Sequence, residues 1–273
     1  MRLGFGAWAL AAALAALAAL ASPVAFVADI RGNATIEGEG KRVTFLTELT
    51  AGTRLVIGSH AGATVTYATT GAEFTMSGPG LFLVGPQEVT AERGPAPRRR
   101  NVSALTDPGV VTRAAQAATA SLRMRGLATS APAALLEYPV ATRVATLQPR
   151  LRWKGVDGES YTVAVQDAAG RDLWKGKGSA QGTAPAVQLA PASRYSWTIS
   201  GSRGSAGEAH FETLPAEAIR RAEASRAAAR SFPEKVVHAL LLQELGAEQE
   251  ARATWGALAR ERSDLAELTA LAR

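Results

Sequence analysis

Apolar and polar residues alternate with a period of two through the first third of the chain. Over residues 24–94 the apolar positions fall in short runs such as "RVTFL", "TRLVIG" and "ATVTYA", and glycine-containing turn sequences separate the runs. Runs this short and numerous predict a compact all-β sandwich or roll of antiparallel strands. Within 63–67 we expect the apolar residues to face the core, and Thr64 and Thr66 to lie on the opposite, less buried face.

The sequence Ser77-Gly78-Pro79-Gly80 has the density of glycine that a phosphate-binding loop would need. Such a loop leads from a strand into the N-terminus of a helix, so that free N–H groups face the anion. Here the glycines lead into another strand-like run, 81–84, and the proline has no N–H to donate. We therefore predict a turn at this position and no ligand contact.

A second stretch with a period of two runs over residues 148–213, and it predicts another sandwich. The segment between the two stretches, 95–134, is rich in Pro, Gly and Arg and is interpreted as a linker, with Arg98–Arg100 in a solvated loop. Within it, "TASLRMRG" has the alternation of one further strand. The inward positions predicted for the second sandwich are Leu151, Trp153, Tyr161, Val163, Val165, Val187, Leu189, Tyr195, Trp197, Ile199 and Phe211.

Beyond Leu214 the spacing becomes helical. The stretch "AEAIRRAEASRAAAR" predicts a helix that lies on the surface, and Ser231 with Glu234 forms a capping box that opens a second helix. Three short helices bury too little apolar surface to be stable alone, so the tail must pack against something else. The polar, arginine-bearing spacer "AEASRAAAR", residues 222–230, favours packing against a partner protein over packing against the β-region of the same chain. The apolar stripes of the tail are Val237, Leu240, Leu241 and Leu245, then Ala251, Trp255 and Leu258, then Leu265, Leu268 and Leu271.

The first 21 residues have the features of a secretory signal peptide. Arg2 gives a short positive start, an alanine-rich apolar stretch follows, and Ala19-Leu20-Ala21 is a small-x-small cleavage site. We expect cleavage after Ala21, and an uncleaved anchor is the alternative. No later apolar run has the roughly 18 to 20 residues of a membrane helix.

Composition narrows the classes of function. The chain of 273 residues has a net charge of +6, but its cations are scattered and no nucleic-acid-binding motif accompanies them, so a nucleic-acid partner is not expected. It has no cysteine, which excludes disulfides, thiolate metal sites and cysteine nucleophiles. The only three histidines lie in separate segments, without a metal-binding spacing: His60, His210 and His238. We find no catalytic serine motif and expect no cofactor and no enzyme, although two carboxylates could still converge in three dimensions.

Residues 48–84, "ELTAGTRLVIGSHAGATVTYATTGAEFTMSGPGLFLV", combine a Leu-x-x-Gly, a hairpin of alternating strands and a Gly-Pro-Gly turn. This succession resembles the FecR domain of bacterial envelope proteins, over residues 24–94. In signalling members of that family the domain lies in the periplasm and is joined through a membrane helix to a cytoplasmic segment that controls a sigma factor. This sequence shows neither of those two parts. The resemblance therefore implies a periplasmic module for binding or sensing.

Two weaker resemblances concern the rest of the chain. The stretch "LAPASRYSWTI" is similar to the tyrosine corner of fibronectin type III and immunoglobulin-like domains, in which the hydroxyl, here of Tyr195, bonds back to nearby backbone. It implies a spacer or recognition module. The helical tail resembles one tetratricopeptide hairpin, with Ser263 where that repeat usually has proline. One such repeat cannot build the peptide groove of an array.

The sequence thus predicts a mainly β protein with two β-domains, the second a fibronectin type III/immunoglobulin-like sandwich, and a short α-helical C-terminal tail. The expected function is a non-catalytic protein of the bacterial periplasm that binds an envelope protein partner in sensing or signal-related assembly. The alternative is an accessory that binds cell-wall polysaccharide, for which Trp174 is the candidate ligand-binding residue; its other interpretation is packing in the sandwich. The predicted segments are 1–21 (signal peptide), 22–94 (FecR-like), 95–134 (linker), 135–214 (fibronectin-like) and 215–273 (helical tail).

Overall fold

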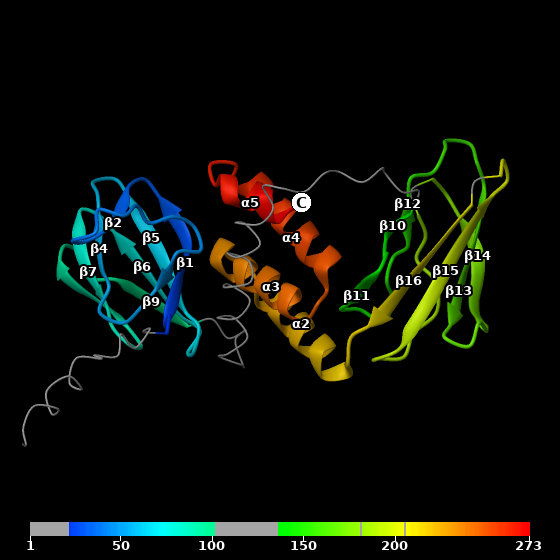
Figure 1. Ribbon diagram of the computed structural model, residues 1–273, viewed down its shortest axis with the longest axis horizontal. Helices are drawn as coiled ribbons and strands as arrows, with labels where there is room; N and C mark the ends of the chain where they lie inside the picture. The colour runs from blue at the N-terminus through cyan, green and yellow to red at the C-terminus, as the bar shows by residue number, and fades with distance from the viewer. Residues whose placement is uncertain (1–21, 102–135, 181, 205) are drawn as a thin grey trace, which may run out of the picture.

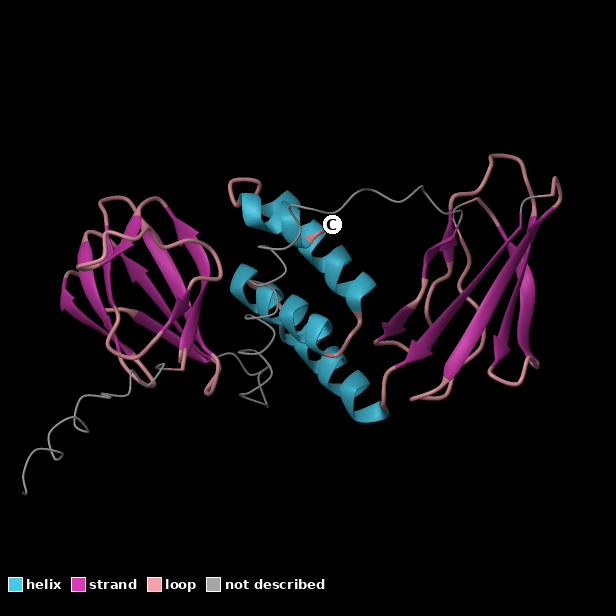
Figure 2. Cartoon of the chain, in the orientation of Figure 1, coloured by secondary structure: helices cyan, strands magenta, loops and turns pink. Residues whose placement is uncertain are grey.

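The computed structural model describes residues 22–101, 136–180, 182–204 and 206–273. Two β-rich parts lie at opposite ends of an elongated molecule, and a group of helices lies between them (Figures 1 and 2). We call them the N-terminal β-unit (22–101), the second β-unit (136–214) and the helical layer (215–273). A mainly β fold with helices at the C-terminal end is confirmed. The predicted signal peptide and the strand-like "TASLRMRG" lie outside the described residues.

Nine strands form the N-terminal β-unit. They are β1 (Ala25–Arg31), β2 (Ala34–Ile36), β3 (Glu48–Leu49), β4 (Arg54–Ile57), β5 (Gly62–Tyr67), β6 (Ala72–Ser77), β7 (Gly80–Val84), β8 (Val89–Arg93) and β9 (Arg98–Asn101). All their pairings are antiparallel, in one sheet of order β3-β1-β5-β6-β9 and a second of order β2-β4-β7-β8. The apolar faces of both sheets contribute to one buried core, as the alternation of the sequence predicts.

The glycine cluster is a turn, as predicted. Strand β6 ends at Ser77 and β7 begins at Gly80, so the cluster connects two strands that belong to different sheets. A Cβ on Gly78 would lie 2.0 Å from the carbonyl oxygen of Gly58. The glycine is needed here because two backbone segments approach closely, which a side chain would prevent.

The prediction that Arg98–Arg100 lies in a solvated loop is wrong. These residues form β9, the strand at one edge of the first sheet, and their register with β6 pairs Thr75 with Arg98 and Glu73 with Arg100. All four residues of β9 are exposed, so the strand carries no apolar alternation that a sequence pattern could detect. The N-terminal β-unit therefore extends to residue 101, into the segment interpreted as a linker.

The second β-unit contains seven strands: β10 (Leu136–Tyr138), β11 (Thr142–Val144), β12 (Arg152–Trp153), β13 (Tyr161–Asp167), β14 (Asp172–Gly178), β15 (Arg194–Gly201) and β16 (Ala206–Thr213). Five of them form a sheet of order β11-β16-β15-β13-β14, in which only the β11–β16 pair is parallel, and β10 pairs with β12. All the predicted inward residues belong to its core, with Val187 partly buried.

Four helices follow: α2 (Ala216–Ala228), α3 (Phe232–Glu244), α4 (Glu248–Glu261) and α5 (Ala266–Leu271). The predicted capping box is present at the start of α3. The Ser231 side chain accepts from the backbone N–H of Glu234, and the Glu234 carboxylate accepts from the backbone N–H of Ser231 at 2.7 Å. Gly246 has a φ of 78° just beyond α3, where a left-handed residue ends a helix.

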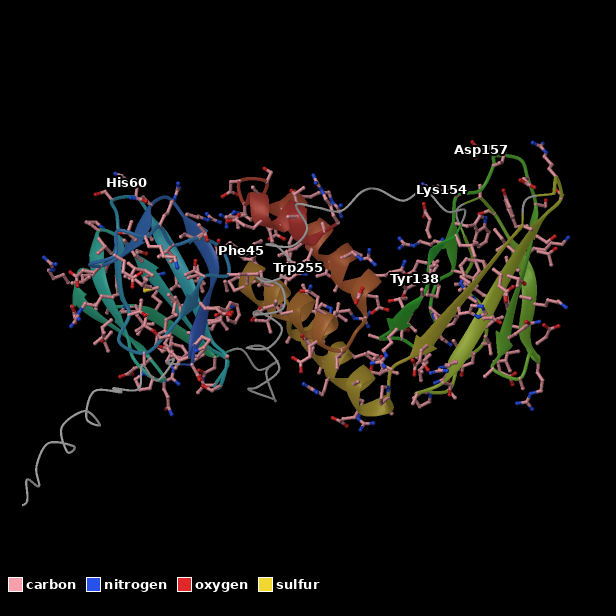
Figure 3. The ribbon with its side chains drawn as sticks, viewed as in Figure 1. Phe45, His60, Tyr138, Lys154, Asp157 and Trp255 are labelled. Atoms are coloured by element: carbon pink, nitrogen blue, oxygen red, sulfur yellow. The ribbon has the colours of Figure 1, made fainter. Side chains whose placement is uncertain are left out.

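The helical layer covers the outer face of the β1–β5–β6 sheet. Buried residues of α3, α4 and α5 belong to the same core cluster as the strands. The centre of the Phe45 ring lies 6.3 Å from the ring centres of both Phe232 and Trp255, and Figure 3 labels Phe45 and Trp255. This second apolar layer explains why Thr64 and Thr66 are buried, against the prediction of a less buried face. It also explains why successive residues of β1, Ala25 to Ala28, are all buried.

The same helices contact the second β-unit. Leu242, Ala247 and Ala251 pack with Ala145 and Leu214, among others, in a separate apolar cluster. The apolar stripes of the tail are therefore covered by the two β-units of the same chain. The expectation that a partner covers them is wrong. Helix α2, which contains most of the predicted spacer, packs Ile219 and Ala222 into this cluster and does not hold the other helices away from the β-units.

The tyrosine corner provides a test of the second β-unit. The Tyr195 hydroxyl donates to the carbonyl oxygen of Ala190 at 3.2 Å and accepts from the Ala190 N–H at 2.8 Å. We predict that Tyr195→Phe lowers the free energy of unfolding by about 0.5–1.5 kcal/mol through the lost hydrogen bonds. Tyr195→Ala should cost about 3–5 kcal/mol because it also leaves a cavity. Urea denaturation measures both values, and equal small losses would contradict the prediction.

Candidate binding surface

The outer face of the five-stranded sheet in the second β-unit is polar and exposed in part. Along β15 and β16 buried apolar residues alternate with polar ones, so the register places Gln166, Ser196 and His210 in one row and Arg194 beside Glu212 in the next. This face is open because the small β10–β12 sheet packs on the other side. The alternation of the sequence therefore produces both the core and a polar surface.

Two hollows meet on this surface. One has a volume of about 1010 Å³ and lies over the polar rows, reaching Gly246 and Glu248 at the start of α4. The other has a volume of about 730 Å³ and lies at the adjacent end of the unit, around the β13–β14 turn and the segment before β15. They share lining residues, so they form one continuous concave surface. The shared residues are Asp167, Ala168, Arg194, Tyr195 and Glu212.

Positive and negative side chains on this surface are nearly equal in number, and some of them contact one another. Arg143 lies 3.6 Å from Glu212, and the His210 ring lies 3.7 Å from Glu208. In the β13–β14 turn, hydrogen bonds from Arg171 hold the pKa of Asp167 below its ordinary value. A surface with balanced charges does not select a strongly anionic or cationic ligand by long-range attraction.

One apolar side chain stands out at the rim of the second hollow. Leu173 is 41% exposed, in contrast to most large apolar residues of the described chain. It lies where the β13–β14 register shifts: Val165 is opposite Trp174 and Gln166 is opposite Asp172, so Leu173 is the extra residue of a β-bulge. Bulges change the direction of a side chain and are common beside binding sites.

Two residues with a strained backbone conformation line the hollows. Among the described residues, four that are not glycine have a positive φ, and two of them line the hollows: Ala141 (φ 46°) the first and Ala192 (φ 50°) the second. The left-handed region is unfavourable for alanine, because its Cβ crowds the backbone. Such strain persists only where the surrounding structure enforces it, and it is enriched at functional sites.

The sequence-based candidate Trp174 does not lie on this exposed face. It occupies the core side of the sheet opposite Val165, is partly buried, and packs against the sandwich core. Its ring covers Gly176, whose added Cβ would lie 2.3 Å from it. Trp153 and Trp197 are buried in the same core. Among the described residues of this unit, the tryptophans therefore form no exposed row of rings of the kind that binds sugars.

The three histidines lie in three different elements of the fold. His60 is in the turn between β4 and β5, His210 is on the polar sheet face, and His238 is buried in α3. Within the described ranges no group of three or more His, Asp and Glu side chains is placed to hold a metal ion.

A second, smaller site lies where the helical layer meets the second β-unit. Glu250 of α4 accepts a hydrogen bond from the Tyr138 hydroxyl at 2.6 Å and from the Ala145 N–H at 3.1 Å. Tyr138 is labelled in Figure 3. Burial raises the pKa of Glu250, although both hydrogen bonds and the charge of Arg226 oppose the shift. Sequence reasoning missed this contact because Tyr138 and Glu250 are 112 positions apart and neither belongs to a recognisable motif.

His238 is next to the same site and is 9% exposed. Its Nδ1 lies 3.3 Å from the hydroxyl of Ser225, a residue of α2 that is fully buried. Burial, with a smaller contribution from the positive charge of Arg226, lowers the pKa of His238 to about 4. The ring is therefore neutral at pH 7.

The low pKa of His238 predicts a loss of stability in acid. Between pH 6.5 and 4 the unfolded chain binds the histidine proton and the folded chain does not, so the free energy of unfolding falls as the pH falls through this window. We expect His238 to contribute about 1–2 kcal/mol to the loss between pH 7 and pH 5. His238→Gln should remove that part, as measured by urea denaturation of both proteins at several pH values. Parallel pH profiles of the two proteins would contradict this assignment.

No protein-family model matches the chain, and the search of curated proteins found no match either. In the part of the chain that the structure describes, every helix is too short or too polar to cross a membrane.

Proposed function

We propose that this protein is a non-catalytic binding module of the bacterial periplasm, and that the concave surface of its second β-unit binds another envelope protein. The observation that carries the proposal is Leu173, an exposed leucine that a β-bulge presents at the rim of the continuous hollow. An apolar side chain surrounded by polar groups is the usual composition of a protein–protein contact.

The properties of the surface favour a protein over other ligands. Its positive and negative charges are nearly balanced and its hollows are broad and open to solvent, so it suits a large partner with both polar and apolar groups. A cell-wall polysaccharide would instead call for exposed aromatic rings, and Trp174 packs on the core side.

The cellular location rests on the sequence. The N-terminal signal-peptide features and the resemblance of residues 24–94 to the FecR domain support a periplasmic protein that takes part in sensing or signal-related assembly. The fibronectin type III-like features of the second β-unit, including the Tyr195 corner, support a recognition role. In this arrangement the N-terminal β-unit and the helical layer support the binding surface.

Replacement of the exposed leucine tests the proposal. Leu173→Glu places a charge on the apolar side chain that we expect to contact the partner, and it should reduce partner capture in crosslinked periplasm at least tenfold. Val156→Glu is the matched control, because Val156 is 50% exposed but does not line either hollow. Quantification of the crosslinked adduct gives the result. Equal adduct from both variants and the wild type, with all three folded, would overturn the proposal.

A further inference from the structure

A pocket lies at the junction of the helical layer and the second β-unit, and it shares no lining residue with the concave surface described above. It has a volume of about 340 Å³, which is at the lower end of the range for small-molecule sites. We call it the junction pocket. Residues from α2, α3, α4 and the β10–β11 region line it: Tyr138, Ala145, Thr146, Ala222, Glu223, Arg226, His238, Leu242, Glu250, Ala253 and Thr254.

The inner part of the pocket holds the carboxylate of Glu250, which accepts few hydrogen bonds. Glu250 Oε1 accepts hydrogen bonds from the Tyr138 hydroxyl and the Ala145 N–H. The other oxygen, Oε2, accepts only from the same Ala145 N–H, at 3.3 Å. No cation forms an ion pair with it among the described residues. A partly buried carboxylate with spare acceptor capacity favours a ligand that brings hydrogen-bond donors and positive charge.

The α2 side of the pocket carries the opposite charge. Arg226 is exposed and makes no ion pair within the described ranges, yet its charge acts on both Glu250 and His238. A guanidinium presents a planar set of donors that matches a carboxylate. Glu223, one turn earlier on α2, adds negative charge, so a simple anion would be repelled by two carboxylates.

From this arrangement we propose that the junction pocket binds a small zwitterionic aminocarboxylate. Its ammonium group would lie against Glu250, and its carboxylate would pair with Arg226. The neutral His238 ring and the alanine and leucine side chains would contact the short carbon chain between the two charges. This inference rests on the junction pocket alone and does not depend on the proposed protein partner.

Calorimetric titration of the full chain tests the proposal with three zwitterions of increasing length: glycine, β-alanine and γ-aminobutyrate. Each is compared with its single-charge analogues, which for β-alanine are propylamine and propionate. We expect at least one zwitterion to bind tenfold or more tightly than either of its own analogues. No binding by any of the three, or equal binding by the amine alone, would overturn the proposal.

The variant Arg226→Gln tests whether the zwitterion binds in the junction pocket. Because Arg226 is exposed, its replacement should leave the fold intact and reduce the affinity for the zwitterion at least tenfold, to the level of the amine. Arg230→Gln is the matched control, since it removes the same charge four residues further along, outside the lining of the pocket. Equal affinities for the two variants would mean that binding occurs elsewhere, and the assignment would fail.

Discussion

The structure depends on the burial of strand β1 on both of its faces. A strand in the outer part of a sandwich normally has one face exposed to solvent. In β1, however, Ala25, Phe26, Val27 and Ala28 are all buried. The core of the N-terminal β-unit covers one face, and the helical layer covers the other. The helices and the strand therefore stabilise each other, because separating them would expose the β1 face together with the stripes of α3, α4 and α5.

Polar contacts at both edges of this apolar interface fix its orientation. On one side Arg100 of β9 joins Glu73 at 2.9 Å, Glu234 at 3.3 Å and the Ser231 hydroxyl at 2.6 Å, and so connects the sheet to the start of α3. On the other side Arg262 pairs with Asp29 and Asp264 and donates to the Ile30 carbonyl. Hydrogen bonds to Asp264 and then to Asp29 raise the pKa of Arg262, so this cation stays charged.

The strands and helices were predictable where the apolar pattern was strong, and less so where tertiary contacts decide. The strand that ends at Tyr67, the capping box at Ser231 and the Tyr195 corner were predicted from local signals, and the structure has all three. Strand β9 has no apolar residue, so only its pairing with β6 reveals it. The candidate surface was missed because the bulge at Leu173 arises from a shift in strand register that the sequence does not show. The junction pocket was missed because Tyr138 and Glu250 meet only in the folded chain.

The central claim is that the helical layer and the N-terminal β-unit form one cooperative core. Native-state hydrogen exchange tests it most directly, by comparing the opening free energies of the backbone amides of Val27 in β1 and Leu240 in α3 as urea increases. The shared core predicts that both amides exchange through one opening, with the same free energy and the same urea dependence. An α3 amide that exchanges through a separate opening of much lower free energy, while β1 stays protected, would contradict the claim.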